Sequence, residues 1–489
     1  MIFKVFAIYF YDIIIYMMKI NQNIFRSYDI RGVYPSELNE DAAYEIAKAF
    51  CFLHPYAQKI VLARDSRLSS PYLADSMIKA FLEEGKEVMN LGIAPDPLFY
   101  FSIMHYGFGG GIMISGSHNP KEYNGLTINV RKPQSRQPQD LIGKDLSAIK
   151  DIVLRGGEKD RNGIHRGKVL DFDPAQAYVD YVTGKVQLER PLKIILDSGN
   201  GACGYLPEKV FKALGCEVET LFADFDGTFP NHLPDPYVAE NRKAIEEAVL
   251  AKKADLGFMY DSDGDRVAII DNRGRAVDGD LSLLILASQA LEKKTGPVVH
   301  CMRASKAFID EMEKKGAKTY FSISHHNAVI DKILETGAVF GGEITFHFLF
   351  PLDYYLCDDA VFASLEFAQA ASKHNDFASY VDSLPRYFAS PEIFIESKDE
   401  EKFKIIQNLQ EYLRENNYNF IDIDGARINF EHGWALARAS NTTPIIKCRF
   451  EGDTEENLKA IEKEALEIFQ KAGLPITEQV CQQLGLASS

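Results

Sequence analysis

A serine beside a histidine lies in a loop rich in turn-forming residues, GSHNPKEYNG, from Gly116 to Gly125. The apolar run IMIS precedes this loop, so we predict a strand that delivers Ser117 and His118 at its carboxyl end. Open α/β sheets bind ligands at that edge. One interpretation is an Asn-Pro turn whose polar side chains only bond the backbone. The other makes Ser117 a nucleophile or a phosphate carrier.

An acidic loop, DSDGDR from Asp261 to Arg266, directly follows a second apolar run, LGFMY. The carboxylates of Asp261, Asp263 and Asp265 recur at alternate positions and can point to one side as hard oxygen ligands, which suit Mg²⁺ or Ca²⁺. A calcium EF-hand does not fit, because Arg266 stands where that motif has glycine and Asn272 where it has glutamate. The remaining alternative is a solvated acidic loop.

A third loop, GGEITFHF from Gly341 to Phe348, carries a carboxylate, a hydroxyl and an imidazole at alternate positions. Glu343, Thr345 and His347 can therefore face one cleft, where these groups suit sugar hydroxyls. A buried Glu-His pair between aromatic residues would give the same pattern.

A fourth loop, RASNTTP from Arg438 to Pro444, is followed by Arg449 on a predicted strand. It offers guanidinium groups, hydroxyls, a carboxamide and backbone N–H groups, which together can bind a phosphate. A plain Ser-Asn-Thr turn is the alternative.

Short β-branched runs alternate with amphipathic helical stretches from residue 59 onward, which predicts α/β architecture with mostly parallel strands. Ser70 and Pro71 predict the N-cap and first residue of one helix, and Gly85 its end. The alternation restarts near residues 191 and 281, so we expect three α/β units in series. After about residue 383 the order becomes helix, strands and a long terminal helix, which indicates a fourth, α+β domain.

The first twenty residues are nearly all apolar and about long enough to span a membrane. Lys4 and Asp12 interrupt them, and no small-residue cleavage site follows. We expect residues 1–17 to be an extension outside the fold. The predicted domains then span residues 18–171 with the serine loop, 172–274 with the acidic loop, 275–385 with the third loop and 386–489 with the fourth.

Acidic side chains outnumber basic ones by 70 to 54, giving a formal net charge of −16. This balance argues against general binding of nucleic acid or anionic membranes, so an anionic ligand would need local arginines. The seven cysteines are scattered and lack CxxC spacing, which indicates reduced thiols in the cytoplasm. We expect a cytoplasmic protein with neither a nucleic-acid nor a membrane partner.

Taken in order, the four loops resemble those of the α-D-phosphohexomutase family, and the GSHNP form is most similar to bacterial phosphomannomutase/phosphoglucomutase. The match runs from about residue 24 to 470 and includes the stretches FRSYDIRG, RDSRLSSP, GNGACG and FPNHLPDP. The resemblance implies a heart-shaped, four-domain fold with three similar α/β domains, a C-terminal α+β domain, and one loop per domain lining a central cleft.

The resemblance also implies a role for each matching residue. Ser117 would be the phosphoserine, with His118 and Arg31 as further catalytic residues. Ser117, through its phosphate, and Asp261, Asp263 and Asp265 would hold one Mg²⁺. The residues that would bind substrate are Tyr28, Arg266, Arg303, His326, Glu343, Thr345, His347, Arg438, Ser440, Asn441, Thr442 and Arg449.

The implied activity is that of an intramolecular phosphotransferase that interconverts the 6-phosphate and 1-phosphate of mannose, glucose or both. Phospho-Ser117 would phosphorylate the free hydroxyl, and the resulting hexose 1,6-bisphosphate would return its other phosphate. The expected cofactors are Mg²⁺ and this bisphosphate, the expected partners are small-molecule hexose phosphates, and the expected oligomeric state is a monomer or a dimer.

This chain departs from the family pattern at a few positions. Thr127 and Arg303 stand where lysine is usual, and Thr345 and Phe346 replace serine and glycine. These changes affect rate and substrate preference more than reaction class.

Three alternatives remain open. A phosphoglucosamine mutase would differ in substrate only. A haloacid-dehalogenase-type phosphotransferase would use Asp224, since Asp224 and Asp226 lie in a DxDGT arrangement. A non-catalytic sugar-phosphate-binding protein would explain the loss of lysine at Thr127.

Overall fold

The computed structural model describes residues 20–26, 28–132, 137–156, 167–440 and 444–484. The chain divides into two compact units: unit 1 comprises Met1–Val277 and Thr345–Ala378, and unit 2 comprises Asp278–Ile344 and Ser379–Ser489. The predicted extension at residues 1–17 lies outside the described residues. Among the helices of the described ranges, none combines the length and apolarity needed to cross a membrane.

The first sheet of unit 1 carries the serine loop and has the order β1-β5-β4-β2-β3-β7, with β6 paired to β5. Strands β4, β2, β3 and β7 run parallel, whereas β5 runs antiparallel to both β1 and β4. The strands are β1 (Ile30–Val33), β2 (Lys59–Arg64), β3 (Glu87–Ile93), β4 (Gly110–Ile114), β5 (Tyr123–Val130), β6 (Gln139–Asp140) and β7 (Lys168–Asp171). The helical segments are η1 (Gln22–Ile24), α2 (Glu40–Leu53), α3 (Ser70–Glu83), α4 (Asp96–His105), α5 (Gly143–Leu154) and α6 (Ala175–Thr183).

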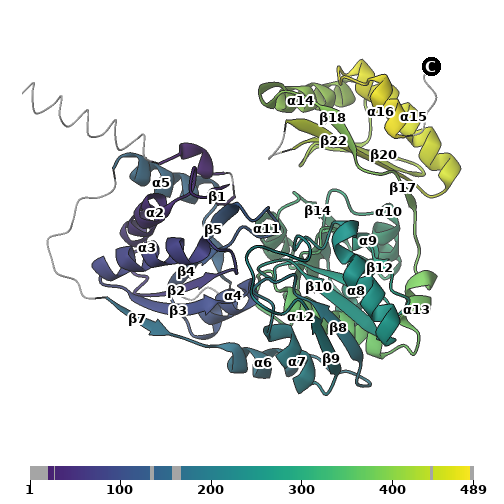
Figure 1. Ribbon diagram of the computed structural model, residues 1–489. Helices are drawn as coiled ribbons and strands as arrows, with labels where there is room; N and C mark the ends of the chain where they lie inside the picture. Colours follow the sequence, from purple (N-terminus) through teal and green to yellow (C-terminus); the bar gives the residue numbers. More distant parts are fainter. Residues whose placement is uncertain (1–19, 27, 133–136, 157–166, 441–443, 485–489) are drawn as a thin grey trace, which may run out of the picture. The chain divides into compact units, whose positions relative to one another are not determined.

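Helices α2, α3 and α5 pack together over the β2–β4 part of this sheet (Figure 1). Their apolar faces bury side chains such as Ile46, Met77 and Ile149 against Ile60 and Ile112 of the strands. Each helix buries one stripe of apolar side chains, and the hydrophobic effect of this burial is the main contribution that holds a helix on a sheet.

Helix α3 begins and ends almost where the sequence predicts. It starts at Ser70, with Pro71 in its first turn, and Gly85 adopts the left-handed φ of 71° that follows a helix end. The predicted N-cap is wrong by one residue, because Ser69 is the N-cap and its side chain makes no capping hydrogen bond. The Ser70 hydroxyl instead donates to Asp65 Oδ1, at 2.6 Å.

The second sheet of unit 1 carries the acidic loop and has the order β12-β11-β10-β8-β9. Strands β9, β8 and β10 are parallel, and β10, β11 and β12 form an antiparallel meander. The elements are β8 (Lys193–Asp197), α7 (Leu206–Ala213), β9 (Glu217–Leu221), α8 (Ala239–Lys252), β10 (Leu256–Tyr260), β11 (Val267–Ile270) and β12 (Ala276–Val277).

The later segment Thr345–Ala378 returns to unit 1. It contains β16 (Phe348–Leu349) and α12 (Ala360–Ser372), and α12 packs on β10 and β11. The Tyr260 hydroxyl at the end of β10 donates to Ser364 Oγ of this helix, at 2.9 Å. The acidic loop is therefore supported by a segment about 100 residues further along the chain.

Unit 2 contains a parallel set of strands, in which β13 pairs with both β14 and β15. It also contains an antiparallel sheet with the order β17-β22-β21-β20-β19, in which β18 pairs with β22. Its first part has α9 (Gly279–Lys293), β13 (Val298–Cys301), α10 (Lys306–Lys314), β14 (Thr319–Ser322), α11 (His326–Thr336) and β15 (Phe340–Gly342). After α13 (Phe377–Ser383) come β17 (Phe388–Ala389), β18 (Ile393–Glu396), α14 (Asp399–Glu415), β19 (Phe420–Ile421), β20 (Ala426–Phe430), β21 (Gly433–Ala439), β22 (Ile445–Gly452), α15 (Glu455–Lys471) and α16 (Glu478–Gln483).

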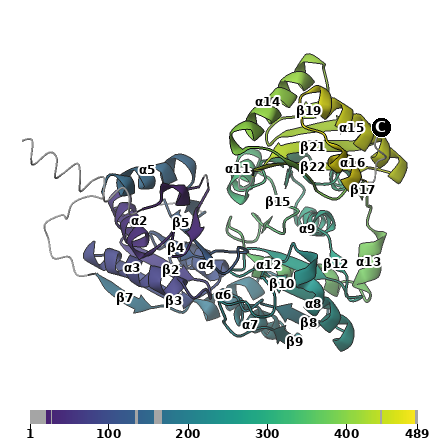
Figure 2. The same ribbon diagram turned by 45° about the horizontal axis from the view of Figure 1, so that its top comes forward.

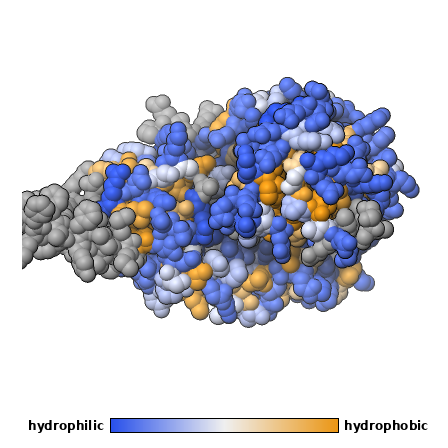
Figure 3. Space-filling view, turned by 90° about the horizontal axis from the view of Figure 1, so that it is seen from above, coloured by the Kyte–Doolittle hydropathy of each residue, from blue (hydrophilic) through white to orange (hydrophobic). Residues whose placement is uncertain are grey.

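Helices α14 and α15 lie on the same side of the antiparallel sheet (Figure 2). Leu409 and Leu413 of α14 and Ala465 and Phe469 of α15 share one core with the strands. Hydrophilic residues cover most of the face drawn in Figure 3, with hydrophobic ones interspersed. The six cysteines whose side chains are described are buried free thiols, in agreement with the sequence expectation.

Candidate active site

Ser117 lies three residues beyond the end of β4, as the sequence predicts, and is only 7% exposed. Its hydroxyl donates to Asp261 Oδ2 at 3.0 Å and accepts from Arg266 Nη2 at 3.1 Å. The Nδ1 atom of the neighbouring His118 is 3.1 Å from the same oxygen. An anion-stabilising guanidinium, a carboxylate and an imidazole therefore surround one serine oxygen.

A buried arginine holds the serine loop in this position. Arg67 forms an ion pair with Asp65 at 2.6 Å and donates to the main-chain oxygens of Ser117 and Asn119. A Cβ atom at position 116 would lie 2.6 Å from Arg67 Nε, so only glycine lets the guanidinium reach the loop. Ser117 has a left-handed φ of 46°, which is uncommon for residues other than glycine and is maintained here by these bonds.

Asp261 organises the acidic loop around itself. Its Oδ1 accepts from the backbone N–H groups of Gly264, Asp265 and Arg266 at 3.0 to 3.2 Å. Its Oδ2 accepts from Arg266 Nε at 3.1 Å and from Ser117. Gly264 has a φ of 78°, and a Cβ atom there would lie 2.4 Å from the sulfur of Cys203. Glycine is therefore required for both the turn and the packing.

Asp263 and Asp265 supply the oxygen atoms that fit a hard cation. In each residue the Oδ1 atom is buried and has no hydrogen-bond partner among the described residues. Buried carboxylate oxygens without hydrogen bonds are costly unless a cation approaches them. The all-oxygen donor set suits Mg²⁺.

The charges around Ser117 shift the pKa values of its neighbours. Burial disfavours ionised Asp261, but the Arg266 guanidinium and the other neighbouring polar groups together outweigh burial and hold the pKa of Asp261 below its usual range. Burial and the negative charge of Asp261 raise the pKa values of Asp263 and Asp265. Arg266, then burial and Arg31, lower the pKa of His118 to about 2, so this imidazole is neutral at pH 7 in the phosphate-free protein.

Arg31 and Tyr28 come from the first strand region. Arg31 lies on β1, opposite Gly125 of β5, and its Nη1 donates to Asn119 Oδ1 of the serine loop. It also pairs with Asp29 at 2.8 Å. Tyr28 is half-buried two residues before β1. Arg31 thus contacts the serine loop directly.

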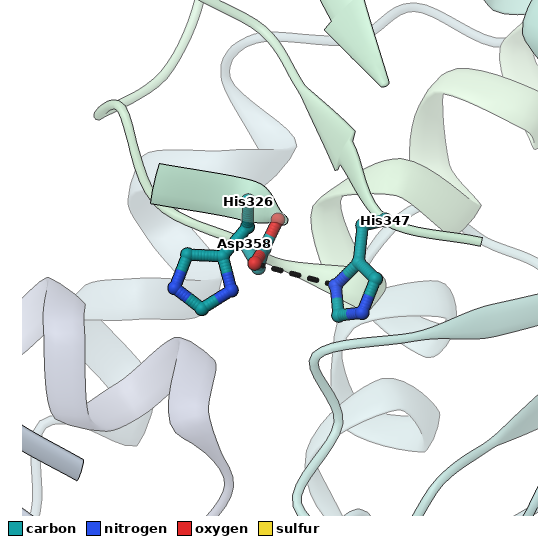
Figure 4. Close-up of side chains that lie close together, drawn as sticks. All are labelled: His326, His347 and Asp358. Carbon is teal, nitrogen blue, oxygen red and sulfur yellow. Dashed lines mark ion pairs between the residues drawn. The ribbon is translucent and has the colours of Figure 1, made fainter. Parts of the chain in front are cut away.

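His347 of the third loop pairs with Asp358, with 3.3 Å between Nδ1 and Oδ2 (Figure 4). Thr345 is half-buried, and Phe346 between them is 4% exposed with its ring 6.3 Å from that of Tyr237. Phe346 has a φ of 74°, a strained conformation for an aromatic residue. A glycine would adopt it at little cost.

Within unit 2, the three predicted arginines each pair with a carboxylate. Arg303 lies 3.6 Å from Glu392, Arg438 lies 3.1 Å from Asp424, and Arg449 lies 3.4 Å from Asp280. Arg449 also donates to the main-chain oxygen of Arg303, at 3.4 Å, so the structure brings these two predicted residues together.

The other predicted residues of unit 2 lie at element ends. Glu343 is 4% exposed directly after β15, His326 is the first residue of α11, and Ser440 is buried directly after β21. Asn441 and Thr442 lie outside the described residues.

Sequence reasoning gave no role to Arg67, Ser115 or Asp96, which the structure places in this site. The Ser115 hydroxyl donates to Asp263 Oδ2 and accepts from the backbone N–H of Ser117. Asp96 follows β3, and its backbone N–H donates to the Asp263 carbonyl at 2.7 Å. The sequence could have indicated Asp96 and Ser115, because polar residues at the carboxyl ends of neighbouring parallel strands meet at one edge of the sheet.

The DxDGT stretch serves a supporting role. Asp224 is exposed, and Asp226 accepts from Thr228. A Cβ atom at Gly227 would lie 2.4 Å from the carbonyl oxygen of Ser66, so this loop packs against the turn that carries Arg67. It therefore offers no buried aspartate nucleophile.

Four family models match the chain in order. They describe domains I, II and III of phosphoglucomutase/phosphomannomutase, over residues 22–152, 176–274 and 278–387, and the C-terminal domain, over residues 393–468. A phosphomannomutase/phosphoglucomutase of Pseudomonas putida is 33% identical over 445 residues, which are 90% of this chain and 94% of that protein. A phosphoglucomutase of Neisseria gonorrhoeae is 32% identical over 451 residues, covering 91% and 96%.

Among solved structures, a phosphoglucomutase/phosphomannomutase family protein from Burkholderia thailandensis matches with a TM-score of 0.85 and 30% identity, over 94% of this chain and 99% of that one. The fold is that of a phosphosugar mutase. The chain belongs to the phosphoglucomutase/phosphomannomutase family. The predicted family, the architecture of three α/β domains with a different C-terminal domain, and the enzyme class, an intramolecular phosphotransferase, are confirmed.

Proposed function

We propose that this enzyme interconverts the 6-phosphates and 1-phosphates of mannose and glucose through phospho-Ser117 and a hexose 1,6-bisphosphate. The observation that carries the proposal is the set of three groups around Ser117 Oγ, from Asp261, Arg266 and His118. The names of the Pseudomonas relative, phosphomannomutase/phosphoglucomutase, and of the Neisseria relative, phosphoglucomutase, support the two sugars.

In the proposed reaction, the P–O bond to Ser117 Oγ breaks as a new P–O bond forms to the sugar hydroxyl oxygen. The sugar hydroxyl loses its proton, and the freed Ser117 oxygen takes up a proton to become a hydroxyl again. The same steps in reverse return the other phosphate of the bisphosphate to Ser117. Transition states of this kind are loose, so the protein's contribution is positioning and charge stabilisation. Arg266, already bonded to the serine oxygen, would neutralise charge on the transferring group, and Arg31 would help.

Asp261, Asp263 and Asp265, with the phosphate on Ser117, would hold Mg²⁺. When bound, this cation would offset negative charge on the phosphoryl group. His118 would donate a hydrogen bond from a ring N–H group to a phosphoserine oxygen. A phosphate placed beside it would raise its pKa.

We further propose that residues away from the serine loop bind the rest of the substrate. Guanidinium groups bind phosphate in bidentate fashion, so the arginines would hold the phosphate that does not react. Carboxylate, hydroxyl and imidazole groups would contact sugar hydroxyls. The phosphate-binding set is Arg303, Arg438, Ser440, Asn441, Thr442 and Arg449, and the sugar-binding set is Tyr28, His326, Glu343, Thr345 and His347.

Phosphoglucosamine mutase is the second candidate, because a probable phosphoglucosamine mutase of Methanothermobacter thermautotrophicus is 30% identical over 452 residues. The substrates differ at C2 of the sugar, so the enzyme should be assayed with mannose, glucose and glucosamine 1-phosphates, with and without Mg²⁺. Metal-dependent conversion of the mannose and glucose compounds, abolished in Ser117→Ala, is the expected result. A clear preference for glucosamine 1-phosphate would support the second candidate, and absence of any conversion would favour a binding protein.

The setting proposed for this enzyme is the cytoplasm, as a monomer or a dimer, with neither nucleic acid nor membrane as a partner. The net charge of −16 and the buried free thiols support this setting.

A further inference from the structure

Asp96 is a buried carboxylate that touches the acidic loop but has no role in the proposed function. It is the first residue of α4 and is 6% exposed. Its backbone N–H donates to the carbonyl oxygen of Asp263 at 2.7 Å, which fixes the start of α4 against the loop. The side chain is therefore held beside the carboxylates that would bind a cation.

Asp96, Asp263 and Asp265 can each offer one carboxylate oxygen such that the three atoms lie within 4.8 Å of one another. The Oδ1 atom of Asp96 is buried and has no hydrogen-bond partner among the described residues, and the same holds for the Oδ1 atoms of Asp263 and Asp265. Three convergent carboxylates, each with a buried oxygen atom that has no donor, are the arrangement expected of cation ligands.

The distribution of charges around Asp96, Asp263 and Asp265 also favours a bound cation. Arg266 pairs with Asp261, and both oxygens of Asp261 already accept hydrogen bonds. The carboxylates of Asp96, Asp263 and Asp265 share no comparable guanidinium partner within the described ranges, since Arg266 reaches only Asp265, at 3.5 Å. Like charges at this separation repel strongly in a buried site, and a divalent cation relieves that repulsion.

We propose that Asp96 is a fourth carboxylate of the metal centre and holds the divalent cation together with Asp263 and Asp265, directly or through one water molecule. This inference rests on the proposed function, which places Mg²⁺ at the acidic loop. The competing explanation is that Asp96 only interacts with the positive end of α4. The two explanations differ in what happens to metal affinity when the carboxylate becomes an amide.

The test is the Mn²⁺ affinity of metal-free, dephosphorylated protein, measured by electron paramagnetic resonance of the unbound ion. We expect Asp96→Asn to raise the Kd for Mn²⁺ about tenfold or more, because loss of a ligand or of its outer partner typically costs about 10 to 100-fold. The matched control is Asp140→Asn. Asp140 is a nearby buried carboxylate whose Oδ1 accepts from Tyr100 and Asn129, at 3.0 Å each, and which is outside the oxygen set. Asp140→Asn should change the Kd for Mn²⁺ no more than about twofold.

An unchanged Kd in Asp96→Asn would overturn the inference, and so would equal weakening in Asp140→Asn, which would indicate a general charge effect. If the parent protein binds no Mn²⁺, the proposed metal site itself is wrong. Circular dichroism checks that each variant folds. Should Asp96→Asn fail to fold, Asp96→Ser removes the carboxylate with less bulk and carries the same expectation.

Discussion

Replacing Arg67 with lysine should impair both stability and catalysis, although the charge is conserved. Arg67 donates from Nη1 to Asp65 and to Ser262 Oγ, and from Nη2 to the main-chain oxygens of Ser117 and Asn119. A lysine ammonium can keep the bond to Asp65 but lacks the planar fork that reaches both main-chain oxygens. The serine loop would then lose the two bonds that fix its position.

The size of the effect follows from those two bonds. A hydrogen bond from a charged donor contributes about 1.5 kcal/mol or more, so Arg67→Lys should destabilise unit 1 by about 3 kcal/mol. At about 2 °C per kcal/mol, the apparent melting temperature should fall by about 6 °C. Displacing Ser117 by about 1 Å should lower kcat by about a hundredfold.

The assay compares melting curves and mutase kcat for Arg67→Lys, the parent and Arg64→Lys. Arg64 is a suitable control because it lies on the preceding strand and the one side-chain hydrogen bond that it donates among the described residues is long, 3.5 Å to the Asp65 carbonyl. The control should behave like the parent. If Arg67→Lys retains kcat within about twofold and melts within about 1 °C of the parent, the guanidinium does not hold the serine loop and this reasoning is wrong.

Three further predictions follow from single residues. The His118 pKa of about 2 lies below the value of about 6.5 in an unfolded chain, so its stabilising effect is complete above about pH 6.5 and is lost as pH falls. Dephosphorylated parent protein should therefore lose about 2 kcal/mol more stability between pH 7 and pH 5 than His118→Asn does in denaturant titrations, and equal losses would contradict the assignment. Phe346→Gly should be more stable than Phe346→Ala by about 1 kcal/mol, since only glycine relieves the φ of 74°, and the reverse order of melting temperatures would show that the strain is absent. Lys121, which is exposed four residues after Ser117, is expected to replace part of the charge missing at Thr127, so Lys121→Ala should lower kcat about tenfold and Thr127→Lys on that variant should restore part of it. A kcat within about twofold of the parent would make Lys121 an ordinary surface residue.

The parallel strands were predictable because their signals are local. An apolar run such as that of β4 or β10 is followed by a polar loop, and this local pattern alone places Ser117 and Asp261 beyond strand ends. The antiparallel strands β5 and β11 were not predicted. The first residues of β5 belong to the polar serine loop, and their pairing with β1 identifies them as a strand. The apolar run Val267–Ile270 of β11 carried a strand signal that the sequence analysis did not use.

Other features depend on contacts between segments distant in sequence, which no local pattern reveals. The bond from Arg67 to Ser117 joins residues 50 positions apart, and the return of α12 to unit 1 joins residues about 100 positions apart. The approach of Asp96 to Asp263 is of the same kind. The left-handed φ of Phe346 was unexpected because bulky residues rarely adopt it, and packing against Tyr237 accompanies it here.

The most direct test of the central claim is to find where the enzyme carries phosphate. Purified protein incubated with glucose 1,6-bisphosphate should be digested and mapped by mass spectrometry, with and without hydroxylamine. We expect one phosphate on the Ser117 peptide that survives hydroxylamine, and none on that peptide in Ser117→Ala. Phosphate lost to hydroxylamine, or found on an aspartate such as Asp224, would contradict it.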